Sequence, residues 1–216
     1  MVYQLDRIKR DVRVCIDQNQ NSGALVIDND TDMLTLEDVI ESKIVEAVDM
    51  VHTMAPYWLL DTGHNFDGSL SDAVYWGNQA SGWVILPEDF LRLVVFKMSD
   101  WERPVYEPIA VNSPMYRRQH SRIKALRGTA QRPVCAVAVH PEGKVLEFWS
   151  CKNTNAYITR SVYVPRAVID TNGGVEICER CYQSVVYAVA SLTMTSCGET
   201  ERAGNYLELM KKNLEK

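Results

Sequence analysis

Near both ends of the chain, apolar side chains recur with the period of an amphipathic helix. Thr35 is a favourable N-cap for the clearest of these stretches, and Glu37 and Asp38 follow where acidic side chains oppose the helix dipole. The apolar stripe then consists of Leu36, Ile40, Ile44, Val48, Val51 and Ala55. Pro56 cannot continue a helix. The pattern therefore predicts a helix that starts after Thr35 and stops before Pro56.

Three more segments carry a helical period, namely 2–17, 175–197 and 200–214. Between the two helix pairs lie strand-like runs at 73–76, 83–86, 91–98, 105–109, 134–139, 145–149 and 158–164. An amphipathic helix must bury its stripe against another element. We therefore expect an α+β fold in which the N- and C-terminal helix pairs form a four-helix bundle with an inserted antiparallel β module. The corresponding domains are 1–56, 57–170 and 171–216.

Composition places the chain among ordinary globular proteins, with 46% hydrophobic and 24% charged residues. Its net charge of −5 argues against a general nucleic-acid coat, which is expected to be basic. No apolar run approaches the roughly 20 residues of a membrane helix. We therefore expect no membrane partner.

One short motif matches the signature of aspartic proteases, Asp61-Thr62-Gly63. That chemistry requires two carboxylates that share a proton, so a single copy needs a symmetric dimer. The motif closely follows a long helix, and His64 stands where a small residue is usual. We interpret it as a turn and predict no catalytic residue, with an aspartic-protease-like enzyme using Asp61 as an alternative.

Two further motifs suggest metal sites, and the first is an acidic loop. Asp28, Asp30 and Asp32 have the spacing of an EF-hand calcium loop, but the positions that require Gly and Glu hold Met33 and Val39. The loop therefore lacks both its sharp turn and its bidentate ligand. We interpret it as a solvated acidic loop.

The second motif is the CxxC pair Cys178 and Cys181, a spacing that can bind zinc or carry out redox chemistry. There is no second such pair in the sequence. Cys181 falls on the apolar face of its predicted helix, where a buried thiol behaves as a small hydrophobe. We predict no metal and no cofactor.

Charge is distributed unevenly along the chain. Residues 28–49 contain eight acidic residues and one base: Asp28, Asp30, Asp32, Glu37, Asp38, Glu41, Glu46 and Asp49, with Lys43. Residues 117–132 contain no acidic residue and six bases: Arg117, Arg118, Arg122, Lys124, Arg127 and Arg132. This basic segment either contacts DNA phosphates or meets the acidic segment of a neighbouring copy. Opposite patches on one chain suit a head-to-tail interface that closes into a ring.

The chain resembles the head–tail connector, or adaptor, proteins of tailed bacteriophages, and among them those of short-tailed crAss-like phages. The resemblance lies in the acidic helix at 36–48, the segment 86–93 that opens the β module, and the closing helix pair, above all 181–192. It implies a structural virion protein, assembled in the host cytoplasm, without catalysis. It also implies a homo-oligomeric ring of about twelve copies, a dodecamer, that binds the portal protein on one side and the tail proteins on the other. We expect DNA to pass through this ring.

Within that interpretation, the candidate acidic interface residues are Asp28, Asp30, Asp32, Glu37, Asp38 and Glu41. The basic segment supplies the opposite interface or lines the DNA channel. Chain ends are usually free unless a partner holds them, so we expect the C-terminal lysines Lys211, Lys212 and Lys216 to dock on the portal. The alternative to a connector, besides the enzyme, is a cytoplasmic nucleic-acid-binding module.

Overall fold

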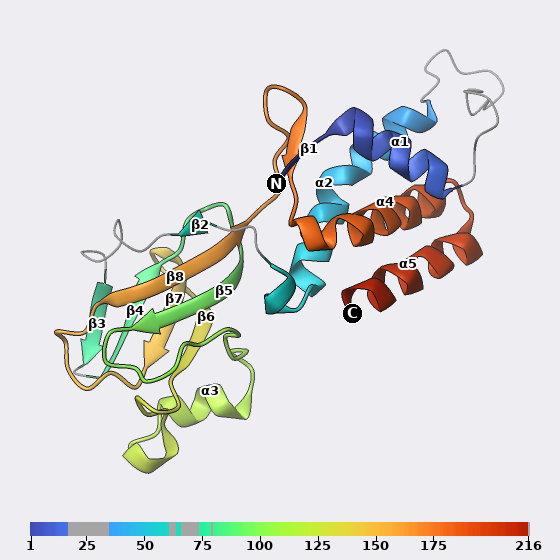
Figure 1. Ribbon diagram of the computed structural model, residues 1–216. Coiled ribbons are helices and arrows are strands. Elements are labelled where there is room, and N and C mark those ends of the chain that lie inside the picture. Colours follow the sequence, from blue (N-terminus) through green and yellow to red (C-terminus); the bar gives the residue numbers. More distant parts are fainter. Residues whose placement is uncertain (17–34, 61–63, 66–73, 79, 216) are drawn as a thin grey trace. The chain divides into compact units, whose positions relative to one another are not determined.

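The chain divides into two compact units (Figure 1). The computed structural model describes residues 1–16, 35–60, 64–65, 74–78 and 80–215. The helical unit comprises Met1–Thr62 with Arg166–Lys216, and the β unit comprises Gly63–Pro165. In sequence, the β unit is therefore inserted between the two halves of the helical unit.

The helical unit combines helices with a small antiparallel sheet. Its elements are β1 (Val2–Gln4), α1 (Leu5–Cys15), α2 (Leu36–Met54), η1 (Tyr57–Leu59), β9 (Gly174–Glu176), η4 (Glu179–Cys181), α4 (Tyr182–Ser196) and α5 (Thr200–Leu214). β1 pairs with β9 and places Tyr3 opposite Val175. The ring of Tyr3 also stacks on Tyr182 with centroids 4.2 Å apart, which joins the start of the chain to the start of α4.

The start of α2 confirms Thr35 as its N-cap. The Thr35 hydroxyl accepts a hydrogen bond from the Asp38 amide at 3.3 Å, and the Asp38 carboxylate accepts one from the Thr35 amide at 2.9 Å. This reciprocal capping box satisfies amides that the first helical turn leaves without intrahelical partners. Ala55 caps the other end in extended conformation, directly before Pro56.

The predicted four-helix bundle is wrong, although the mixed α+β class is consistent with the structure. α4 packs against α1, α2 and α5, so the helices surround one central helix. Small side chains let α5 approach: the Ser191 hydroxyl donates to the Ala203 carbonyl at 2.8 Å, and the Asn213 side-chain amide donates to the Ser184 hydroxyl at 2.9 Å. Periodicity indicated one buried stripe on α4, whereas its small polar residues are buried as well.

The described strands of the β unit form two antiparallel sheets. One has the order β3-β4-β7-β6, from β3 (Val74–Asn78), β4 (Ser81–Ile85), β7 (Gly143–Trp149) and β6 (Val134–His140). The other has the order β2-β8-β5, from β2 (His64–Asn65), β8 (Ile158–Pro165) and β5 (Phe90–Met98). The predicted strand at 105–109 forms only isolated bridges, from Val105 to Phe96 and from Ile109 to Ala136.

An apolar core lies between these two sheets. Val84, Leu146 and Phe148 enter it from the four-stranded sheet, and Leu93, Phe96 and Ile158 enter it from the other. The rings of Phe96 and Phe148 meet with centroids 5.9 Å apart. Since strand side chains alternate between faces, the neighbours of these residues on β4 and β7 lie on the opposite, outer face of the four-stranded sheet. That outer face holds the candidate site.

Candidate functional site

The basic segment lies in the long connection from β5 to β6. It includes α3 (Pro114–Gln119), which Ser113 caps through a hydrogen bond from the Tyr116 amide, and η3 (Lys124–Leu126). Tyr116 anchors α3 to a small apolar cluster of Val134, Ala136 and Trp149 on the outer face of the sheet. The segment is therefore held on a sheet.

Buried Gln119 fixes the path of the chain after α3. Its side-chain nitrogen donates to the Met115 carbonyl at 3.1 Å, and its side-chain oxygen accepts from the Gly128 amide at 2.8 Å. A second tie comes from Arg127, whose Nε donates to the Ser121 carbonyl at 2.5 Å. These bonds close the basic segment into a loop with internal support.

Most arginines of this loop face solvent. Arg117, Arg118, Arg122 and Arg132 are exposed, and Arg127 is partly buried, whereas the side chain of Lys124 lies outside the described residues. Large apolar side chains of the same loop are exposed as well, with Ile123 at 60%, Leu126 at 49% and Met115 at 44%. We call residues 115–126 the basic–apolar surface. Its mixture of arginine with exposed apolar side chains is typical of protein interfaces.

A carboxylate stands beside this loop with both oxygens engaged. Tyr116 donates its phenolic hydrogen to Glu147 Oε2 at 2.7 Å, and His140 Nε2 lies 2.8 Å from Glu147 Oε1. Burial, and then the hydrogen bond and charge of Glu147, raise the pKa of Tyr116 to about 12. Tyr116 thus remains a donor at physiological pH, and the orientation of Glu147 is fixed from two sides.

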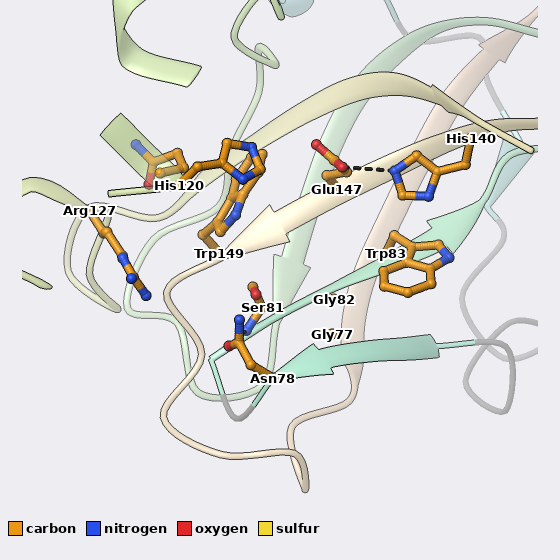
Figure 2. Close-up of a pocket in the computed structure, with 11 residues that line it drawn as sticks. Gly77, Asn78, Ser81, Gly82, Trp83, His120, Arg127, His140, Glu147 and Trp149 are labelled. Atoms are coloured by element: carbon orange, nitrogen blue, oxygen red, sulfur yellow. Dashed lines mark hydrogen bonds and ion pairs between the residues drawn. The ribbon is translucent and has the colours of Figure 1, made fainter. Parts of the chain in front are cut away.

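Beside this carboxylate lies a pocket of about 280 Å³ on the outer face of the sheet (Figure 2). It is lined by Gly77, Asn78, Ser81, Gly82, Trp83, Gln119, His120, Arg127, His140, Glu147 and Trp149. A side chain at Gly82 would meet the ring of Phe148 at 2.9 Å, so only glycine lets β4 lie this close over the core. A larger hollow of about 690 Å³ shares Asn78, Ser81, Arg127 and Trp149 with it.

The acidic candidates are used within the helical unit. Glu37 pairs with Arg13 of α1 at 2.5 Å, Glu41 pairs with Lys9, and Asp38 belongs to the capping box. The hydrogen bond that the Lys9 ammonium donates to the Glu41 carboxylate raises the pKa of Lys9, in spite of an opposing effect of burial. Asp28, Asp30 and Asp32 lie outside the described residues.

Two of the C-terminal candidates, Lys211 and Lys212, lie on α5, which packs on α4. Lys211 and Lys212 are exposed, while Met210 and Leu214 are buried, and Lys216 lies outside the described residues. The Tyr206 hydroxyl donates to the Cys15 carbonyl at 3.1 Å. The end of the chain is thus held by its own unit, and its lysines project from a docked helix.

The remaining sequence motifs are the cysteine pair Cys178 and Cys181 and the motif at Asp61. Cys178 and Cys181 are both buried, and the Cys178 thiol donates to the Leu59 carbonyl. Asp61 lies outside the described residues. Among those described, no three His, Cys, Asp or Glu side chains are grouped to hold a metal ion. None of the described helices combines the length and apolar character needed to cross a membrane.

The sequence interpretation missed the pocket except for Arg127. The sequence offered only a weak indication of this site. Glu147 and Trp149 are two residues apart on β7 and Trp83 is on β4, so strand alternation alone could have placed them on one face of a sheet. What brings them together is the pairing of β4 with β7, which places Trp83 opposite Glu147. A scan against models of known protein families and a search of curated proteins found no match to this chain.

Proposed function

We propose that the protein is a structural virion protein that forms a homo-oligomeric ring between the capsid portal and the tail. DNA passes through this ring. The observation that carries the proposal is the basic–apolar surface, where exposed Arg117, Arg118 and Arg122 share one loop with exposed Met115, Ile123 and Leu126. Exposed apolar side chains gathered on a supported loop are costly unless a partner covers them.

A second copy of the chain suits this surface. Every copy carries the acidic segment 28–49, and a head-to-tail contact between two different patches generates a ring when its rotation closes. All the described carboxylates of the segment already have partners in their own chain, namely Glu37, Asp38, Glu41, Glu46 and Asp49. In this proposal the attraction therefore falls mainly to Asp28, Asp30 and Asp32. Charge pairs at a rim are individually worth about 0–1 kcal/mol, so the apolar side chains supply most of the contact energy.

The resemblance to phage connectors supports the same proposal. Its acidic segment 36–48 lies within α2, the segment 86–93 leads into β5, and 181–192 belongs to the central helix α4. In this proposal the exposed Lys211 and Lys212 of α5 contact the portal, the tail proteins bind the opposite side of the ring, and no catalytic step is involved.

A nucleic-acid-binding module is the second candidate, because the exposed arginines of the loop could equally contact phosphates. The two candidates differ in what the arginines bind. A ring component assembles without DNA, and a nucleic-acid-binding module shifts the mobility of duplex DNA in a salt-dependent way while it remains a monomer.

The mass of the assembly tests the proposal. The purified chain is measured by light scattering alone and with the portal protein encoded by the same genome, each after nuclease treatment. We expect a mass of many copies in the presence of portal. A chain that stays monomeric with portal, and gains mass only when DNA is added, contradicts the ring and favours the nucleic-acid-binding module.

A further inference from the structure

We propose that the pocket on the outer face of the four-stranded sheet binds a nucleotide, with the base between its aromatic side chains and the phosphate at Arg127. The ligand can be a free nucleotide or an unpaired nucleotide of a strand, because both present the same ring and phosphate. This inference does not depend on ring assembly, since every lining residue comes from one copy of the β unit.

Hydrogen-bond donors gather at one end of the pocket. Arg127 uses Nε to bind the Ser121 carbonyl, and among the described residues its two terminal nitrogens remain available to bind an anion. The side-chain oxygen of Asn78 accepts from the amides of Ala80 and Ser81 at 2.9 and 3.0 Å, so this amide presents its nitrogen as a donor. The Ser81 hydroxyl lies in the same lining. Together these groups match the acceptor oxygens of a phosphate.

Aromatic rings form the walls. Trp83 comes from β4, and Trp149 with His120 forms the opposite side in Figure 2. Trp83 is backed by Tyr75, stacked at a centroid distance of 5.9 Å, and Trp149 is held edge-on by His120 at 5.6 Å. Such supported rings suit a flat partner, because nucleobases stack on aromatic side chains irrespective of their sequence.

The remaining wall carries the acceptor. Glu147 is held by Tyr116 and His140, and each of its oxygens keeps a lone pair after one hydrogen bond. A carboxylate here repels a phosphate and accepts from the N–H groups of a base. The pocket therefore has an acceptor at Glu147 and a cation at Arg127, with rings between them. A nucleotide matches this arrangement, because its base carries N–H donors at one end and its phosphate is an anion at the other. A neutral sugar has no anionic group to pair with the guanidinium.

The adjoining hollow extends the site at its cationic end. It shares Arg127 and Asn78 with the pocket and adds Thr129 and Lys152 to the lining. A phosphate at Arg127 thus has room on both sides. A nucleotide that continues into a strand can follow this hollow without leaving the outer face of the sheet.

Titration with dAMP tests the proposal, followed by the indole N–H resonances of the full-length chain in NMR spectra. We expect saturable shifts of Trp83 and Trp149, whereas Trp58, which is exposed in the helical unit, serves as the internal control. Deoxyadenosine lacks the phosphate and 2-deoxyribose 5-phosphate lacks the base, and each should bind about tenfold or more weakly than dAMP. This readout needs no variant and is independent of assembly with the portal.

The variant R127Q should weaken dAMP binding about tenfold or more, because a charge-assisted hydrogen bond is lost. The matched control is R160Q, an exposed arginine of β8 outside the pocket, and it should change the affinity less than about twofold. The proposal is overturned by an absence of saturable shifts, by equal binding of 2-deoxyribose 5-phosphate, by equal loss in the two variants, or by equal binding of the neutral sugar maltose.

Discussion

The acidic residues of α2 bind groups of their own chain, whereas the arginines of the basic segment largely face solvent. Glu37 and Glu41 pair with Arg13 and Lys9, and Asp38 closes the capping box. Arg117 and Arg118, by contrast, extend from a helix that is anchored through Tyr116. Two segments that have similar charge density in sequence thus have different uses. A charged segment indicates an interface only after its partners within the chain have been accounted for.

The largest effect is expected in the interior of the helical unit. Replacing buried Val189 of α4 by Asp places a charge where α4 is covered by other helices, and should cost about 3 kcal/mol or more of unfolding free energy. The control is Val14→Asp on α1, where the side chain is 63% exposed, with an expected cost below about 1 kcal/mol. Urea unfolding measures both. Equal costs would show that α4 is not the centre of this unit.

The next effect concerns the basic–apolar surface. The double variant Ile123→Asp with Leu126→Asp should prevent assembly with the portal while leaving the melting temperature near that of the parent, because both side chains are exposed. Val139→Asp is the matched control, since Val139 is 80% exposed at the β6–β7 hairpin of the same unit. Light scattering reports the assembly. Normal assembly of the double variant rules out this surface as the contact.

A smaller effect is expected from charge alone. Reversing Arg117, Arg118 and Arg122 to Glu should weaken assembly, and the loss should shrink as salt is raised, because rim charges are screened. A compensating reversal to Lys should work better at Asp28, Asp30 and Asp32 than at Glu37 and Glu41, whose reversal also breaks pairs with α1. Equal rescue of assembly by both sets would mean that the pairs of Glu37 and Glu41 with α1 do not keep these carboxylates from contacting a neighbouring copy.

The smallest effect is a pH dependence at the start of α2. Hydrogen bonds from the Thr35 side chain and then its backbone amide lower the pKa of Asp38. A carboxyl group with a lowered folded-state pKa stabilises the fold above its unfolded value, near 3.9, and loses that contribution as the pH falls through the folded value. Asp38→Ala should therefore destabilise the chain at neutral pH, and the difference from the parent should vanish in acid. A difference that is constant from neutral pH to about pH 2 contradicts this account.

Local structure was predictable where it depends on neighbouring residues. Thr35 caps α2 as its position before the apolar stripe indicates, and the strands β5 to β8 occupy most of the runs in which strand-forming residues predominate. Segment 105–109 also holds strand-forming residues but forms only isolated bridges, and Pro108 within it has no backbone N–H to donate to a ladder. Strand propensity cannot distinguish a continuous ladder from one bridge.

Tertiary arrangement was less predictable. The prediction of a four-helix bundle was wrong because it assumed that α4 buries only its apolar stripe. Ser184 and Ser191 of α4 are buried as well, and both form hydrogen bonds with α5. The pocket was missed because Trp83 and Glu147 are brought together by strand pairing across a long separation in sequence. Within each strand such a pair is visible only as an alternation of inward and outward side chains. No single segment of the sequence contains the whole site.

Site-specific cross-linking in the assembled particle tests most directly whether the basic–apolar surface is the contact between copies. A photoreactive amino acid at position 123 is activated after the chain has joined the portal, and the products are separated by mass. The proposal predicts a covalent dimer of this chain, with the cross-link in residues 28–49 of the second copy, and little dimer when the probe is at position 139. A cross-link from position 123 to DNA, or no product at all, contradicts it.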